Sequence, residues 1–306
     1  MVTLKQIGKR TYYFTGLFRV GVYVMQDVKE DMNQDIPVCL IDSGLDAEYA
    51  GEMDAVLVQH HFRVQLIINT HYHADHSGGN AFFKEKYDCT IVATKMNAAL
   101  ISNYDICPAL VWGAAPLNEI MNHYFYTESS ETYDIEDIDL PEGISYEYLP
   151  GHCLSMIAVR TSDDVLFLGD AVVSEKTLEH HSLTYIYEID SYLQSLEKLE
   201  TLDAALYVPY HADPVEDIIP LASANRRSVM NNIAVIRDIC ETPRTLEEIY
   251  SIIYNRCGYQ TNLYRYGVEI AIIRTYLTYL HNSGELETTV ENNYVKWYIP
   301  QSESGE

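Results

Sequence analysis

One short segment, His71-Tyr72-His73-Ala74-Asp75-His76, constrains this chain more than any other feature of its sequence. It places three imidazoles and a carboxylate within six positions. The apolar run 64–70 precedes it and predicts a buried strand, and Ser77-Gly78-Gly79-Asn80 follows it and allows the chain to turn into a helix. We therefore expect the cluster at the end of a strand, on the rim of a sheet.

The spacing of these polar side chains suits metal coordination. In extended backbone alternate side chains share one side, so His71 and His73 can face one cation. The turn that follows can direct Asp75 and His76 toward a second cation. A single histidine is more often a surface or satisfied core residue, but a cluster of this kind has no comparable packing role, because buried unpaired imidazoles and carboxylates cost free energy. The segment predicts a site for two metal ions.

Residues 70–79, with the sequence Thr-His-Tyr-His-Ala-Asp-His-Ser-Gly-Gly, resemble the signature of the metallo-β-lactamase fold superfamily in its glyoxalase II-like form. Other segments resemble the remaining motifs of this family, in the family's order, over about the first 220 residues. Each candidate ligand in them follows an apolar or alternating run that predicts a strand. The segments are Ile41-Asp42-Ser43-Gly44, Leu149-Pro150-Gly151-His152, Phe167-Leu168-Gly169-Asp170 and Val208-Pro209-Tyr210-His211-Ala212-Asp213.

The resemblance implies both a fold and a set of ligands. The implied fold is an αββα sandwich of the α/β class, with two sheets between layers of helices. Asp42 is implied to orient a ligand and to tune its basicity without touching a metal. The implied ligands are His71, His73 and His152 for a first metal, Asp75, His76 and His211 for a second, and Asp170 as the bridge between them.

These ligands indicate the cofactor and the reaction. Imidazole nitrogen and carboxylate oxygen without thiolate suit zinc, which is the expected metal, and iron and manganese accept the same ligands. Two such ions about 3.5–4 Å apart can share one hydroxide and lower its pKa toward neutrality. We therefore expect hydrolysis, in which a metal-bridging hydroxide attacks a carbonyl or phosphorus centre and Asp75 acts as a catalytic residue that handles the proton.

Two differences from known branches of this family argue against a diiron oxidoreductase and against an antibiotic-resistance enzyme. Flavodiiron proteins resemble this fold but carry glutamate at the position of His73, together with a flavodoxin-like domain that this sequence does not show. The zinc β-lactamases that hydrolyse antibiotics typically carry cysteine at the position of Asp170 and are exported. A small ester or thioester is the expected substrate, as in glyoxalase II, although the glutathione-binding helical domain of that enzyme has no counterpart here.

Charge argues against polyanionic partners. The chain of 306 residues has a formal net charge of −25 at pH 7. Residues 1–220 contain 12 lysines and arginines against 35 aspartates and glutamates, whereas residues 221–300 contain eight of each. An acidic surface repels nucleic-acid phosphates and anionic membranes. We therefore expect a small-molecule substrate, and neither a nucleic acid nor a membrane as a partner.

Features of the whole chain predict a cytoplasmic protein. The first ten residues lack the apolar core of a signal peptide, and no apolar run approaches the length of a membrane span. The cysteines are scattered without a Cys-x-x-Cys pair, so we expect reduced, mostly buried thiols.

Residues 102–147 are expected to form an insertion on the substrate side. They are rich in aromatic and acidic residues, and Pro108 and Pro116 break helix continuity. Two interpretations are open at this point. The aromatics can line a ligand pocket, or the segment can be a surface excursion whose aromatics cover the sheet.

We expect a catalytic domain at residues 1–220 and a small winged-helix-like domain at residues 221–306. Helical periodicity or caps predict helices near 221–240, 245–254 and 266–282, and alternation predicts a hairpin of strands 286–290 and 294–299. This arrangement resembles the C-terminal domain of the β-lactamase-like protein 2 group. Its third helix offers no evident recognition face for DNA, so packing, homodimer formation or closing one side of the active-site cleft is the expected role.

The sequence thus predicts a dinuclear metal-dependent hydrolase of a small ester or thioester. Two alternatives remain open. A metal-dependent phosphodiesterase or ribonuclease is favoured by the winged-helix-like module and opposed by the acidity. A non-catalytic metal-binding regulatory protein is opposed by the complete ligand set.

Overall fold

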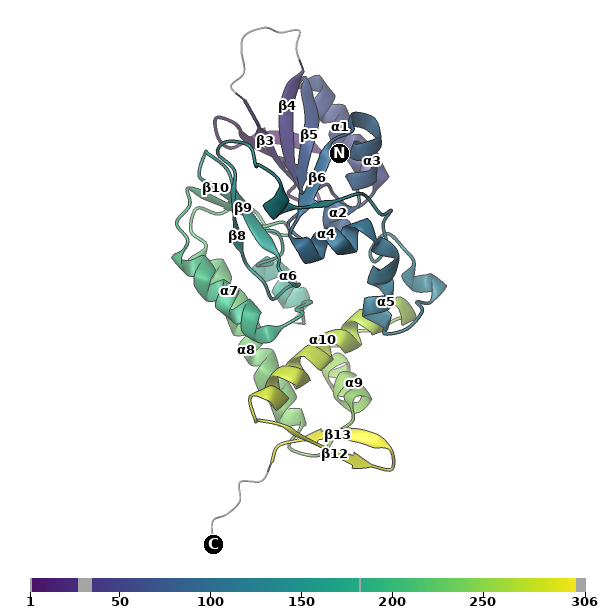
Figure 1. Cartoon of the computed structure of the whole chain (residues 1–306). Coiled ribbons are helices and arrows are strands. Elements are labelled where there is room, and N and C mark those ends of the chain that lie inside the picture. The colour runs from purple at the N-terminus through teal and green to yellow at the C-terminus, as the bar shows by residue number, and fades with distance from the viewer. Residues whose placement is uncertain (1, 27–34, 182, 301–306) are drawn as a thin grey trace.

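Two β-sheets face one another between layers of helices in the computed structural model, which describes residues 2–26, 35–181 and 183–300 (Figure 1). The first sheet has the strand order β1-β2-β3-β4-β5-β6-β7 and the second the order β11-β10-β9-β8. The strands of the first sheet are β1 (Thr3–Gln6), β2 (Thr11–Thr15), β3 (Gly21–Val24), β4 (Ile36–Ile41), β5 (Phe62–Ile68), β6 (Thr90–Ala93) and β7 (Tyr133–Asp134). Those of the second are β8 (Ser145–Tyr148), β9 (Ile157–Arg160), β10 (Val165–Phe167) and β11 (Leu206–Val208).

The central strands are apolar because both of their faces are covered. Strands β4 and β5 run parallel, and such strands read as nearly continuous hydrophobic runs when helices and a second sheet enclose them. Cys39 and Ile68 point toward the second sheet, where they meet Phe167 in one cluster of buried side chains. The last residues of β5 are all buried, so the chain enters the His71 segment from the interior of the molecule.

Helices complete the two outer layers. Helices α1 (Ala47–Gln59) and α3 (Asn80–Tyr87) pack on the outer face of the first sheet, where Met53 and Phe83 contact the cluster that contains Val64. Helices α7 (Ile189–Thr201) and α8 (Ile219–Ile239) cover the second sheet (Figure 1). The predicted αββα sandwich is therefore confirmed. Further short helices lie in the connections: α2 (Ala74–Ser77), α4 (Lys95–Ser102), α5 (Cys107–Trp112), α6 (Glu175–His180), and the 3-10 turns η1 (Tyr104–Ile106), η2 (Asn118–Ile120) and η3 (Ile135–Asp137).

The segment 102–147 carries more regular structure than its prolines suggest. Pro108 lies in the first turn of α5. A proline is tolerated there because the N–H that it lacks has no helical partner in any case. Pro108 thus begins a helix instead of interrupting one. Helix α5 packs against α10 (Leu263–Asn282), so this segment contacts the C-terminal part of the chain (Figure 1).

The predicted C-terminal helices and hairpin are present. Helix α8 is followed by α9 (Leu246–Arg256), by α10, and by the antiparallel strands β12 (Glu287–Glu291) and β13 (Tyr294–Tyr298). A capping box at Thr245 and Glu248 begins α9, with each side chain accepting a hydrogen bond from the other residue's backbone N–H. Helix α10 begins at Leu263 and not at residue 266, because the Asn262 side chain caps it by accepting from the Arg265 N–H at 3.0 Å.

One apolar core joins this C-terminal part to the sandwich. The same cluster of buried side chains contains Leu168, which directly follows β10 of the second sheet, together with Leu196 of α7, Ile233 of α8 and Tyr276 of α10. Because α8 belongs to both parts, a boundary at residue 220 stays a prediction.

Within the described ranges, every helix is too short or too polar to span a lipid bilayer. Cys257 is exposed and the other cysteines are buried, which confirms that most of them are buried.

A glycine next to the His71 segment provides a test of this packing. A Cβ atom at Gly78 would lie 1.9 Å from the backbone oxygen of Leu45. We expect Gly78→Ala to lower the free energy of unfolding by about 1–3 kcal/mol, because the backbone has to shift to admit the methyl group. Denaturant titration measures this change.

Gly51→Ala is the matched control. It lies inside α1, where a Cβ atom would stay 3.9 Å from its nearest neighbour, Phe82. Alanine is the better helix former by about 1 kcal/mol, so this variant should be neutral or more stable. Equal stability of Gly78→Ala and the wild type would contradict the packing described here.

Candidate metal centre

The predicted ligand residues meet at one rim of the sandwich. They come from loops at strand ends that lie far apart along the chain. His71 and His73 follow β5, and His73 precedes the short helix α2, which carries Asp75 and His76. The others stand between β8 and β9 (His152), after β10 (Asp170) and after β11 (His211).

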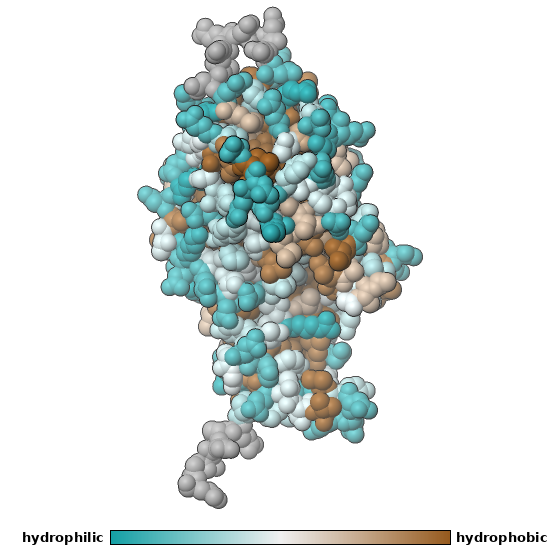
Figure 2. All heavy atoms as spheres, viewed as in Figure 1, coloured by the Kyte–Doolittle hydropathy of each residue, from teal (hydrophilic) through white to brown (hydrophobic). Residues whose placement is uncertain are grey.

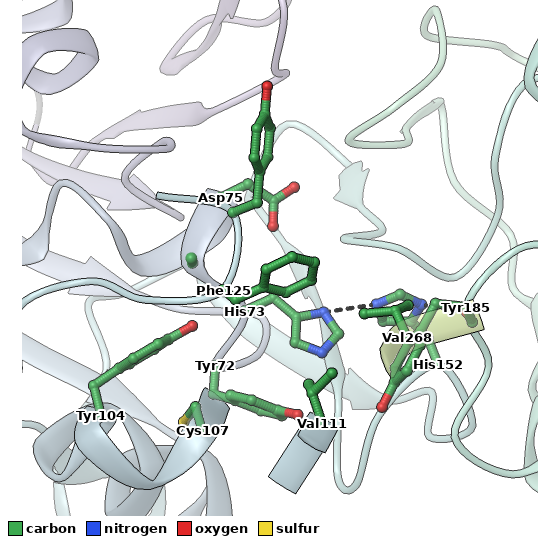
Figure 3. Close-up of a pocket in the computed structure, with 12 residues that line it drawn as sticks. Tyr72, His73, Asp75, Tyr104, Cys107, Val111, Phe125, His152, Tyr185 and Val268 are labelled. Carbon is green, nitrogen blue, oxygen red and sulfur yellow. Dashed lines mark hydrogen bonds between the residues drawn. The ribbon is translucent and has the colours of Figure 1, made fainter. Parts of the chain in front are cut away.

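The first group consists of His71, His73, His152 and Asp170. One ligand atom from each lies within 4.8 Å of the others. His73 Nδ1 lies 2.9 Å from His71 Nε2 and 3.0 Å from His152 Nε2, so three ring nitrogens point toward one small volume. The dashed line in Figure 3 marks the approach of His73 to His152.

The second group consists of Asp75, His76 and His211, which also converge within 4.8 Å. Asp75 Oδ2 lies 3.1 Å from His211 Nε2 and 3.7 Å from His76 Nε2. This group is assembled from both halves of the sandwich, because α2 follows the first sheet and His211 follows a strand of the second.

The carboxylate of Asp170 lies between the two groups. Its Oδ2 atom is 3.3 Å from His152 Nε2, in the first group. Its Oδ1 atom is 3.2 Å from His76 Nε2 and 3.5 Å from His211 Nε2, in the second. The two oxygens of one side chain thus face different groups, which is the geometry that a bridging ligand requires.

The histidines of the first group are held in the neutral form. Burial and the neighbouring imidazoles lower the pKa of His71 well below its usual value. The same causes lower the pKa of His73 to about 3, and burial also lowers the pKa of His152. Because only the neutral imidazole has a free lone pair for a metal, these rings are ready to coordinate.

The second group has the opposite electrostatics. Burial opposes the charged form of His76, but the carboxylates of Asp170, Asp75 and Asp42 raise its pKa well above the usual value. Burial alone would raise the pKa of Asp75, yet His76 and His211 hold it at about 2. The carboxylates therefore favour positive charge here, which either protons or a divalent cation can supply.

Asp42 contacts a candidate ligand without joining either group. Its Oδ2 atom accepts a hydrogen bond from His76 Nδ1 at 2.8 Å, which leaves Nε2 of that ring directed at Asp170. Its Oδ1 atom accepts from the Thr70 backbone N–H at 2.7 Å. Asp42 is buried and adopts φ 64°. Such contacts fix the tautomer and the orientation of a metal-binding histidine.

Sequence reasoning missed several supporting contacts. The backbone oxygen of Tyr185 accepts from His152 Nδ1 at 3.0 Å, and no local sequence signal marks a backbone carbonyl. The Tyr210 ring stacks on His76 with centroids 3.8 Å apart, and its hydroxyl donates to the Asp75 backbone oxygen at 2.6 Å. The signal for Tyr210 is its place directly before His211 in the last motif.

A pocket of about 160 Å³ lies beside both groups (Figure 3). Its lining includes candidate ligands from both groups, so a molecule in the pocket reaches them directly. The remaining walls come from the His71 segment, from residues 102–147, from the loop before α7, and from α10. The lining residues are Tyr72, His73, Ala74, Asp75, Tyr104, Cys107, Val111, Tyr124, Phe125, His152, Tyr185 and Val268.

The residues at the rim fit a metal. His76 Nε2 and Asp170 Oδ1 are buried and lie 3.2 Å apart, but neither makes a well-aligned hydrogen bond within the described part of the chain. A buried polar atom without a partner costs about 1–3 kcal/mol, so a native structure normally satisfies it. Both atoms are Lewis bases that face the same small volume, and a divalent cation would satisfy both.

An αββα sandwich with imidazoles and carboxylates gathered at one rim defines a class of metal-binding proteins. Comparison with known families identifies the class further: residues 37–211 match the metallo-beta-lactamase superfamily, and the chain belongs to it. The resemblance seen in the sequence motifs is therefore confirmed.

Cys153, which follows His152, is buried and is absent from both groups of candidate ligands among the described residues.

Curated relatives match parts of the chain. An atrochrysone carboxyl ACP thioesterase of Aspergillus fumigatus is 24% identical over 58% of this chain and 48% of its own length. The beta-lactamase-like protein 2 homolog of Drosophila melanogaster is 25% identical over 59% of this chain and 56% of its own. A hydroxyacylglutathione hydrolase of Rhodopseudomonas palustris is 36% identical over 43% of each chain. The chain spans about half the length of the curated relatives it matches.

A solved structure resembles nearly the whole fold. The crystal structure of a metallo-beta-lactamase family protein from Thermus thermophilus superposes with a TM-score of 0.68 and 16% identity. The match covers 98% of both chains, so it includes the helices and the hairpin that follow the sandwich.

Replacing Asp42 tests its contact with His76. In Asp42→Asn an amide N–H can face His76 Nδ1, which favours the tautomer whose proton sits on Nε2. We expect metal affinity to fall about 10–100-fold, as is typical when such a partner is lost. Competition with a chromogenic chelator measures the affinity.

Asp54→Asn serves as the control, because Asp54 is another buried aspartate, bound to Lys86 and Tyr87 on the outer layer. It should lose stability but keep the wild-type metal affinity. An Asp42→Asn protein with unchanged affinity would show that Asp42 does not orient His76.

Proposed function

We propose that the chain is a dinuclear metal-dependent hydrolase that cleaves a small thioester or ester. The proposal depends above all on Asp170, whose two carboxylate oxygens face two different groups of candidate ligands. In this proposal His71, His73 and His152 would hold one ion, Asp75, His76 and His211 would hold the other, and Asp170 would be a ligand shared by the two.

The donor set supports zinc as the resident metal. All donors are imidazole nitrogens or carboxylate oxygens, which zinc prefers, and iron or manganese would accept the same atoms. A pair of such ions supplies Lewis acidity and lowers the pKa of water toward neutrality.

The side chains of this protein hold the candidate metal ligands in position and provide a carboxylate for proton transfer. The His71 and His73 rings are neutral and fixed in place, and Asp42 orients the His76 ring. Asp75 is ionised, because its pKa is held at about 2, and its side chain lines the pocket. Asp75 is therefore placed to accept the proton of the attacking water and to return it to the leaving thiolate or alkoxide. The overall reaction consumes water and yields a carboxylic acid and a thiol or alcohol.

The relatives and the pocket both support a thioester. Two of the related proteins are a thioesterase and a hydroxyacylglutathione hydrolase. The pocket beside the ligands has no lysine or arginine among its described lining residues, and the whole chain carries a net charge of −25. A nucleic-acid substrate would favour a basic surface. These observations favour the small thioester over a phosphodiester.

The C-terminal part of the chain contributes one wall of the substrate pocket in this proposal. We assign residues 1–220 to the catalytic sandwich and residues 221–306 to a winged-helix-like module. The module closes one side of the pocket, because Val268 of α10 belongs to the lining. The contact between α10 and α5 holds that wall in position.

Metal analysis combined with a substrate panel tests the function. Purified protein should bind two divalent ions per chain and hydrolyse thioesters faster than phosphodiesters. Removing the metal with a chelator should abolish turnover, and zinc should restore it. A protein that retains two ions but cleaves only phosphodiesters, or one that cleaves nothing, would overturn the proposal.

Asp170→Ala tests the bridge. We expect turnover to fall at least about a hundredfold, because Lewis-acid stabilisation of the transition state contributes several kcal/mol. Metal content should fall below two ions per chain while the circular dichroism spectrum stays unchanged. Asp54→Ala, which removes a buried carboxylate far from the rim, should keep its turnover. A fully active Asp170→Ala protein with two bound ions would contradict the bridging role.

A further inference from the structure

The wall of the pocket opposite the candidate ligands is apolar and aromatic. Val111 of α5, Val268 of α10 and Phe125 line it, together with Tyr72 and Tyr185. Figure 3 shows these side chains gathered around His73 and His152. A wall of this composition gains free energy by covering apolar surface.

The pocket wall is also electrically neutral. Residues 96–159, which provide much of it, contain no lysine or arginine. Burial raises the pKa of the Cys107 thiol to about 12 and that of the Tyr185 hydroxyl to about 12, so both stay protonated. Asp75 is the lining residue that carries negative charge, and it belongs to the candidate ligands. An anionic group meets no lysine or arginine among the described lining residues of this pocket. Arg265, in the adjacent hollow, is paired with Glu269 at 3.2 Å.

The surface next to the pocket continues this apolar character. Next to the lining residue Cys107, Ile106 is 50% exposed, and Tyr124 of the lining is 60% exposed. Figure 2 shows hydrophobic atoms gathered on this side of the molecule, over α5. Exposed apolar patches of this kind mark contact surfaces for apolar ligands.

We propose that this pocket binds the acyl group of the substrate and selects uncharged apolar or aromatic acyl groups over short or anionic ones. Val111, Phe125 and Val268 are then the specificity-determining residues. The acyl group is the better occupant than the leaving group, because the thiols of biological thioesters carry amide or charged groups that need polar partners. The inference rests on the proposed function, since it names the substrate class of the same site.

The selectivity can be measured with thioesters that share one simple thiol. We use the N-acetylcysteamine thioesters of acetate, hexanoate, phenylacetate and succinate with the full-length, zinc-loaded protein, and follow thiol release. Each methylene that moves from water into the wall should raise kcat/KM about fourfold, so hexanoyl and phenylacetyl thioesters should exceed the acetyl thioester at least about tenfold. The succinyl thioester should be the poorest substrate.

A pair of charge variants on one helix tests the residues. Val111→Lys places an ammonium group in the wall, whereas Leu110→Lys places the same charge on the exposed side of α5, outside the lining. Val111→Lys should lower kcat/KM for the hexanoyl thioester at least about tenfold and raise it for the succinyl thioester. Leu110→Lys should change neither value more than about threefold, because water and salt screen an exposed charge.

Val268→Lys repeats the test from α10 in case Val111→Lys does not fold, and metal content and circular dichroism report on folding.

Failure of this inference is distinguishable from failure of the proposed function. If thioesters are hydrolysed without preference for apolar acyl groups, or the lysine variants leave the preference unchanged, the inference is wrong and the hydrolase stands.

A binding measurement gives a readout that does not depend on turnover. Isothermal titration of the zinc-loaded protein with hexanoate and with succinate should show hexanoate binding at least about tenfold more tightly. If neither thioesters nor esters are cleaved, the proposed function is wrong. Equal binding of the two carboxylates would overturn the pocket's selectivity.

Discussion

The whole site depends on one buried carboxylate held at a fixed distance from histidines on both sides. Asp170 reaches both groups only because the backbone before it turns sharply at the end of β10. Gly169 has φ 51°, and a Cβ atom there would lie 2.8 Å from Thr70 Oγ1. Only glycine lets the two strand ends approach so closely. The hydroxyl of the same Thr70 donates to Asp42, so one threonine connects the glycine turn to the residue that orients His76.

One wall of the pocket is built from segments that are remote in the sequence from the candidate ligands. The sandwich supplies the chemistry, and α5 and α10 supply the apolar wall. This division lets the wall vary in composition without replacing a donor atom, because Val111 and Val268 belong to neither group of candidate ligands. The C-terminal helices share one buried core with the second sheet. This packing holds α10, and with it the apolar wall of the pocket, in a fixed position.

The grouping of the candidate ligands could be predicted from sequence, whereas the pocket was only one of two open interpretations of residues 102–147, and the reasons are physical. His71, His73, Asp75 and His76 lie within six positions, so their joint chemistry is visible locally, and the sandwich prediction followed from strands that end at such residues. Val268 and the Tyr185 carbonyl contribute only through long-range packing. Pro108 was expected to break a helix but begins α5, because a proline in the first turn and one in the interior look alike in sequence. The boundary at residue 220 stays a prediction, since α8 serves both parts.

Each group of donors draws atoms from both sheets: His71 and His73 from the first with His152 and Asp170 from the second, and Asp75 and His76 from the first with His211 from the second. A cation bound in either group would therefore link the two halves of the sandwich to each other. Its contribution to stability would grow with the logarithm of the free metal concentration. Metal supply would then set how firmly the two sheets stay together, as well as whether the site is competent for chemistry.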